Sequence, residues 1–164
     1  MKPSFSNFIT LIFSLLLISC EGIDCTVNNV VMCHYTFYAS GSEDVVSVKD
    51  TLTITAEGTD SVLYNKGVNV SKLSLPMSHW KEADTLNFTF KSSTQDYSQQ
   101  MSLYIRKDNI PHFENPDCPT TMFHQITGID LDSPTHCVDS VVIANPSVNY
   151  ATQENIKIYL RISN

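Results

Sequence analysis

Apolar and polar residues alternate with a period of two along much of the chain after residue 30. The alternation is regular in residues 51–57, 85–91 and 101–107. This pattern predicts β-strands that bury one face. Residues 30–39, 61–65, 70–75, 121–129, 135–144 and 155–162, rich in β-branched, aromatic or alternating apolar residues, are expected to form the other strands. Because no long window follows the helical period, the chain is expected to be all-β, with about nine short strands in a sandwich or barrel.

The last of these stretches has the most complete alternation. Ile156, Ile158, Leu160 and Ile162 fall on one face of the strand, so this face is expected to close the core. Polar turns are expected at residues 57–60, 130–134 and 145–149. The longer polar segments, 40–50 and 92–100, are expected at the ends of a sandwich.

The N-terminus has the organisation of an export signal. Lys2 precedes an apolar run over residues 8–18, which is too short to span a bilayer as a helix. The segment Leu17-Ile18-Ser19-Cys20 resembles a bacterial lipobox, in which a peptidase cuts before a cysteine that carries a diacylglyceryl group. We therefore expect residues 1–19 to be a lipoprotein signal peptide, Cys20 the lipid attachment site, residues 20–29 a lipid-anchored tether and residues 30–164 the folded domain. The alternative is a secretory peptide that ends at a chance cysteine.

The charge balance limits the partners. The formal net charge is −7 at pH 7, and the sequence has no basic cluster. This composition argues against binding to nucleic acid and against docking onto anionic lipid headgroups. Membrane attachment is therefore expected to come from the lipid on Cys20, in the cell envelope and most simply at the outer membrane, facing either the periplasm or the surface.

Four cysteines remain besides Cys20, and an even number in an exported protein suggests two disulfides. The preferred pairing joins Cys25 with Cys118 and Cys33 with Cys137. The pairing of Cys25 with Cys33 and of Cys118 with Cys137 remains open. A zinc site fits poorly because no CxxC motif occurs.

Several segments resemble a known family. They are residues 139–149 followed by 154–158, Pro111-His112-Phe113 followed by Cys118, and the block formed by residues 51–54 and 63–65. Together they are similar to a family of short Bacteroidetes lipoproteins that form a domain of unknown function. The resemblance implies an immunoglobulin-like antiparallel β-sandwich of about 7–9 strands, envelope residence and no assigned activity. Genes of that family often lie beside one for an outer-membrane β-barrel protein, which implies a partner of that kind. Cys137 stands where the family pattern has an apolar residue.

Catalytic patterns are not evident in the sequence. No GxSxG nucleophile elbow occurs. His124 and His136 fall on strands expected to be neighbours, but the histidines lack tight metal-ligand spacing. We therefore expect no enzyme, no cofactor and no metal site. The preferred interpretation is a lipid-anchored binding or accessory module for another envelope protein.

Exposed aromatic residues suggest an alternative function, a glycan-binding surface lipoprotein. Trp80 and Tyr97 fall in polar loops, and aromatic faces can stack on sugar rings. The simpler interpretation, which we prefer, is that Trp80 plugs the end of the core.

Four triplets of the form Asp, Ser or Thr, apolar resemble the O-glycosylation sequon of exported Bacteroidetes proteins. Their hydroxyl residues are Thr51, Ser61, Thr85 and Ser140. The same triplets also suit the start of a strand, because Asp favours turns and Thr and Val favour strands.

Overall fold

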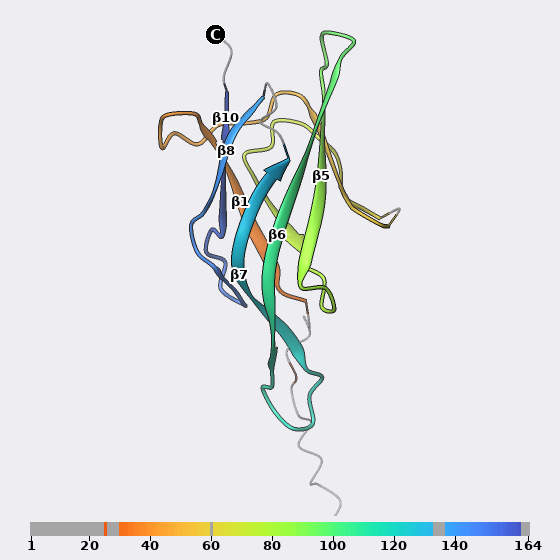
Figure 1. The fold of residues 1–164 in the computed structure, drawn as a ribbon, viewed down its shortest axis with the longest axis vertical. Helices are drawn as coiled ribbons and strands as arrows, with labels where there is room; N and C mark the ends of the chain where they lie inside the picture. The colour runs from red at the N-terminus through yellow and green to blue at the C-terminus, as the bar shows by residue number, and fades with distance from the viewer. Residues whose placement is uncertain (1–24, 26–29, 60, 133–136, 162–164) are drawn as a thin grey trace, which may run out of the picture.

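The computed structural model describes Cys25 and residues 30–59, 61–132 and 137–161. All regular elements in these residues are β-strands (Figure 1). The ten strands are β1 (Met32–Ala39), β2 (Thr51–Ala56), β3 (Val62–Gly67), β4 (Lys72–Pro76), β5 (Ala83–Lys91), β6 (Ser98–His112), β7 (Thr121–Asp132), β8 (Val138–Ile143), β9 (Ser147–Val148) and β10 (Ile156–Leu160). The expected signal peptide and Cys20 lie outside the described residues, as does the tether apart from Cys25.

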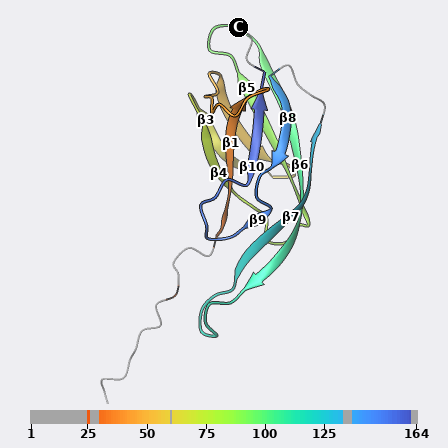
Figure 2. The ribbon, with the colours of Figure 1, turned by 90° about the vertical axis from the view of Figure 1, so that its left-hand side faces the viewer.

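The strands form two sheets. One has the order β4-β1-β10-β8 and the other the order β3-β2-β5-β6-β7-β9 (Figure 2). Apolar residues of both sheets meet in one core, and Phe37, Leu52, Phe88, Leu103 and Ile158 within it are completely buried. This packing confirms the predicted β-sandwich. Every strand in the sheets pairs antiparallel except β1 with β10, which run parallel, so the expectation of a purely antiparallel sandwich is wrong at this pair.

The strand pattern was predicted well in the centre of the sheets and less well at the strand ends. Strand β9 lies inside the segment 145–149 that was expected to be a turn. Strand β7 continues through Asp132, because Asp130 pairs with Tyr104 and forms an ion pair with Arg106 on the outer face. The expected turn at residues 130–134 therefore begins too early, and a sandwich of ten strands replaces the expected seven to nine.

Strand β10 is confirmed as a core strand. It lies between β1 and β8, and its residues Ile156 and Ile158 are completely buried. Ile162 lies outside the described residues. Its central place means that both edges of β10 are hydrogen-bonded, so the strand is part of the sandwich and not an appendage.

Strand β6 is the longest element and extends beyond the sandwich. Its 15 residues span about 48 Å at the rise of an antiparallel strand. Strand β5 pairs with it from Ser98 to Arg106, and from Lys107 to His112 it continues with β7 as a hairpin. We call residues 107–126 the arm. Figures 1 and 2 show it protruding, in teal, from one end of the sandwich.

The expected disulfide between Cys33 and Cys137 is wrong, as is the open alternative pairing. Cys33 lies at the start of β1. Cys137 lies beside the other end of that strand: Arg161 N donates to Cys137 O, and Leu160, the residue before Arg161, pairs with Ala39 at the end of β1. Six residue steps along β1 correspond to about 20 Å, and β10 lies between β1 and β8. A disulfide needs Cα atoms within about 7 Å. Cys33 is instead a completely buried thiol, and burial raises its pKa to about 12.

Candidate functional site

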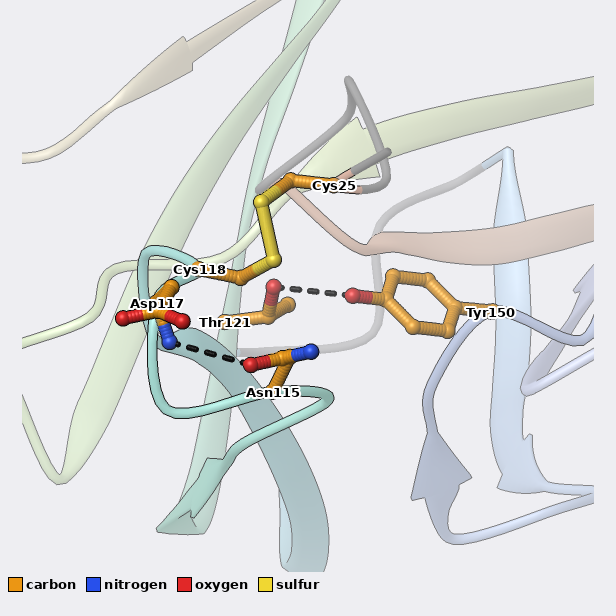
Figure 3. The surroundings of a disulfide bond; sticks show 6 residues. All are labelled: Cys25, Asn115, Asp117, Cys118, Thr121 and Tyr150. Carbon is orange, nitrogen blue, oxygen red and sulfur yellow. Dashed lines mark hydrogen bonds between the residues drawn. A yellow bond between two sulfur atoms is a disulfide. The ribbon is translucent and has the colours of Figure 1, made fainter. Parts of the chain in front are cut away.

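A disulfide joins the start of the described chain to the end of the arm. Cys25 and Cys118 are bonded with their Cα atoms 5.6 Å apart, across 93 residues of sequence (Figure 3). Asn115 organises the loop around Cys118, because its carbonyl accepts from Cys118 N at 3.0 Å and its Oδ1 accepts from Asp117 N at 3.2 Å. This bond confirms the predicted pairing of Cys25 with Cys118.

Aromatic rings join the two strands of the arm to each other and to the segment after β9. The rings of His112 and Phe123 stack with centroids 4.2 Å apart, and the Tyr150 ring meets Phe123 edge-on at 5.0 Å. The Tyr150 hydroxyl donates to Thr121 Oγ1 at 2.8 Å (Figure 3). Since Tyr150 follows β9, a third segment of the chain holds the two strands of the arm, which an isolated hairpin would lack.

A buried lysine lies where the arm leaves the sandwich. The Lys107 side chain is completely buried, and its Nζ donates to Ser78 O at 2.6 Å, to Lys81 O at 2.5 Å and to Asn109 Oδ1 at 2.9 Å. The Asp84 carboxylate lies 3.6 Å from Nζ and accepts from Ser78 N at 3.1 Å. We call this arrangement the lysine clamp. Burial lowers the pKa of Lys107, and the nearby Asp84 charge opposes that shift.

His124 extends the clamp onto β7. Its Nδ1 lies 2.8 Å from Asn109 Oδ1, and Asn109 Nδ2 donates to Lys81 O at 3.0 Å, which fixes the orientation of the amide. His124 Nδ1 therefore carries the proton. The buried Nε2 atom has no hydrogen-bond partner within the described part of the chain. Burial lowers the pKa of His124 to about 4, and the Lys107 charge contributes to this shift.

The lysine clamp holds a loop that displays Trp80. The two carbonyls bound by Lys107 belong to residues on either side of Trp80, and Ser78 Oγ accepts from Trp80 N at 3.4 Å and from Lys81 N at 3.2 Å. The Trp80 side chain is 90% exposed, so the expectation that it plugs the core is wrong. A large aromatic side chain on a fixed backbone can act as an anchor for a partner.

A cleft of about 670 Å³ lies at the opposite end of the sandwich from the arm. Tyr97, which is 42% exposed, and Phe90 line it together with the aliphatic Leu160 and the charged Arg161. Gln99 Oε1 is buried in the same region and has no hydrogen-bond partner among the residues described. The cleft therefore offers the aromatic face of Tyr97 beside the charged Arg161.

Comparison with known proteins gives a family but no activity. The model of a family of unknown function, DUF6452, matches residues 51–160. The chain belongs to this family. No curated protein and no solved structure matches it. In this DUF6452 chain, the matched residues extend from β2 to β10. They include all the segments for which a family resemblance was noted from the sequence.

The two predicted glycan contacts of this DUF6452 chain do not come together. Trp80 precedes the first residue of β5, whereas Tyr97 follows its last. The length of β5 separates them by about 27 Å at the rise of a strand. They can serve two different surfaces, but they cannot stack on the same sugar ring.

The four predicted glycosylation residues differ in exposure. Ser61 and Ser140 are exposed, whereas Thr51 and Thr85 are half-buried within their strands. The aspartate before Ser140 accepts from Ser40 Oγ and pairs with Arg161, as Asp84 pairs with Lys107, so two of the triplets also have structural roles. Asp60, before Ser61, lies outside the described residues. Glycosylation stays a prediction, and Ser61 and Ser140 are its accessible sites.

No group of three His, Cys, Asp or Glu residues within the described ranges is placed to hold a metal ion. His136, the expected neighbour of His124, lies outside those ranges. None of the described residues belongs to a helix long and apolar enough to cross a membrane.

Sequence reasoning missed the lysine clamp. The signal was present, because the alternation that buries Met101, Leu103 and Ile105 also places Lys107 on the inward face. A lysine at an inward position of a strand needs acceptors, since its charge is costly to bury without them. Those acceptors come from the loop before β5, far away in sequence.

Proposed function

We propose that this protein is a lipid-anchored module of the cell envelope, without catalytic activity, that binds another envelope protein such as an outer-membrane β-barrel. The lipobox-like segment Leu17-Ile18-Ser19-Cys20 and the resemblance of the chain to short Bacteroidetes lipoproteins support this proposal. Cys20 is the proposed lipid attachment site and the outer membrane the proposed location, with the domain facing either the periplasm or the surface.

The observation that carries the proposal is the exposure of Trp80 on a clamped loop. Tryptophan is enriched among the residues that dominate protein interfaces. Because Lys107 fixes the carbonyls on both sides of Trp80, little conformational freedom of the loop is lost when a partner binds. Because Trp80 is 90% exposed, its indole ring is available to a partner without any rearrangement of the core.

The place of this loop also suits a membrane-embedded partner. The loop contacts β6 at Lys107 and Asn109, at the base of the arm, and the arm is bonded to Cys25. If Cys20 is lipidated, Trp80 lies on the anchored half of the molecule. The parts of another envelope protein that emerge from the same membrane would then be within reach of Trp80.

The test is co-purification of the full-length protein from its native membranes in mild detergent, compared with Trp80→Ala and with Tyr104→Ala as a matched control. Tyr104 is also an exposed aromatic residue, but it lies on the outer face of β6. A stoichiometric partner should accompany the wild type and Tyr104→Ala and be lost from Trp80→Ala. Recovery of no stoichiometric partner, or equal recovery with Trp80→Ala, would contradict the proposal.

The cleft beside Tyr97 supports a second candidate, glycan binding. Its volume suits a small ligand, and the exposed ring of Tyr97 lines it beside the charged Arg161. On a glycan array, the wild type and Trp80→Ala should be retained and Tyr97→Ala should not. A wild-type protein that binds no glycan would rule this candidate out.

A further inference from the structure

The end of the arm exposes apolar residues that the sandwich does not cover. Phe113, in the loop after β6, is 66% exposed, and Ile110 on the outer face of β6 is 47% exposed. Tyr150, which packs on the same hairpin, is also exposed. The loop is held in one conformation by Asn115 and by the disulfide at Cys118, so Phe113 is displayed on an ordered structure.

The disulfide determines what lies beside this end of the molecule. Cys25 is bonded to Cys118, five residues after Phe113, and Cys20 is five residues before Cys25. Five residues extend to at most about 18 Å. If Cys20 carries lipid, as the proposed function requires, the surface of the bilayer is held within that distance of Cys25 and therefore close to the end of the arm.

Charge restricts the kind of lipid that the arm can contact. Glu114 and Asp117 are exposed in the loop that carries Phe113. Carboxylates are repelled by anionic headgroups, whereas zwitterionic headgroups do not oppose them. Exposed apolar side chains such as Phe can be buried at the boundary between the headgroups and the acyl chains.

We propose that the end of the arm contacts the zwitterionic bilayer that holds the lipid anchor, with Phe113 inserted at the level of the headgroups. This inference rests on the proposed lipid anchor. The disulfide then fixes the orientation of the whole domain: the arm points towards the membrane, and the cleft beside Tyr97 faces away from it.

The sequence contains one tryptophan, Trp80, which makes fluorescence a direct test. Two full-length single-tryptophan variants are prepared, Trp80→Phe/Phe113→Trp and Trp80→Phe/Tyr97→Trp, and reconstituted into phosphatidylcholine vesicles that contain acyl-brominated lipid. Position 113 should show blue-shifted emission that the brominated chains quench, and position 97 should show neither effect. Both sites are exposed in the native protein, so neither substitution is expected to prevent folding, which thermal melts can verify.

Controls distinguish failure of this inference from failure of the anchor. Mass spectrometry of the reconstituted protein shows whether Cys20 carries the diacylglyceryl group. Unquenched emission at position 113 in lipidated protein overturns the inference, whereas missing lipid overturns the proposed anchor. Protection at position 113 that requires an added envelope protein also overturns the inference, because the surface would then be a protein interface. In the Cys25→Ser/Cys118→Ser background, the quenching should be lost.

Discussion

The inward faces of β6 and β7 are built in two different ways. In the sandwich, Met101, Leu103 and Ile105 are buried apolar residues that pack against the opposite sheet. In the arm, Lys107 and His124 occupy equally buried positions, and each contacts Asn109 Oδ1 through a side-chain hydrogen bond. The same two strands therefore change from apolar packing to a polar network within a few residues.

This difference teaches what each half requires of the sequence. Apolar packing needs residues of suitable volume and tolerates similar ones. A buried polar network needs particular donors and acceptors, because each group that loses its partner costs free energy. The arm and the Trp80 loop are therefore more specifically determined, and more easily disrupted, than the centre of the sandwich.

The largest effect is expected from removing β10, which belongs to the apolar core of the sandwich. Truncation after Gln153 deletes β10, whose residues Ile156, Ile158 and Leu160 are buried between β1 and β8. Fully burying each such side chain contributes about 1.5–3 kcal/mol, and the sum is comparable to the stability of a domain. The truncated chain should show no cooperative thermal unfolding. A cooperative transition near the wild-type temperature would mean that the arm and its network hold the fold instead.

The comparison is sharpened by making the same kind of substitution in both halves. Lys107→Met keeps a similar side-chain length but leaves Ser78 O without its donor and the Asp84 carboxylate without its cation, and it should cost about 3–5 kcal/mol. Leu103→Met, on the same face of the same strand, should cost less than about 1.5 kcal/mol. Urea unfolding measures both. Equal losses would show that the clamp contributes no more than ordinary packing.

A smaller effect should appear as a pH dependence of the folding stability, and it should come from the buried His124 in the arm. The pKa of His124 in the folded state is about 4, below its ordinary value of 6.5. The neutral imidazole therefore stabilises the fold fully above about pH 6.5, and this contribution is lost as the pH falls towards 4. Lys107 and His79 face the ring and act in the same direction. When stability is measured by urea unfolding between pH 6.5 and pH 4, His124→Gln should lose less stability than the wild type. Equal losses in the two proteins would contradict the role given to His124.

The smallest effect is expected one residue away from the clamp. Arg106 lies on the outer face of β6, where its exposed guanidinium pairs with the exposed Asp130 carboxylate. Exposed ion pairs contribute about 0–1 kcal/mol. Arg106→Ala should therefore lower the urea midpoint only slightly, and the difference from the wild type should be smaller still in high salt. A loss as large as that of Lys107→Met would show that burial does not distinguish the two cations.

The two halves also differ in how far the sequence predicts them. The alternation in residues 101–107 identified a strand and its inward apolar face, because local periodicity reports burial directly. It could not show that the loop at Ser78 and Lys81 would supply the acceptors for Lys107, since that contact joins residues 26 to 29 positions apart. The correct disulfide at Cys25 was preferred from sequence, but the wrong one at Cys33 was preferred as well, because sequence does not give the distance between strands.

The parallel pairing of β1 with β10 has a consequence for how the protein folds. The first strand of the domain is completed on one side by the last, and His34 N donates to Asn155 Oδ1 across 121 residues of sequence. Contacts of such high sequence separation slow the search for the native state, and domains dominated by them fold in milliseconds to seconds. During synthesis, the pairing of β1 with β10 cannot form until β10 has left the ribosome. Until β10 is available, the four-stranded sheet lacks one of its two inner strands, so the core of the sandwich stays open on that side while the chain is being made.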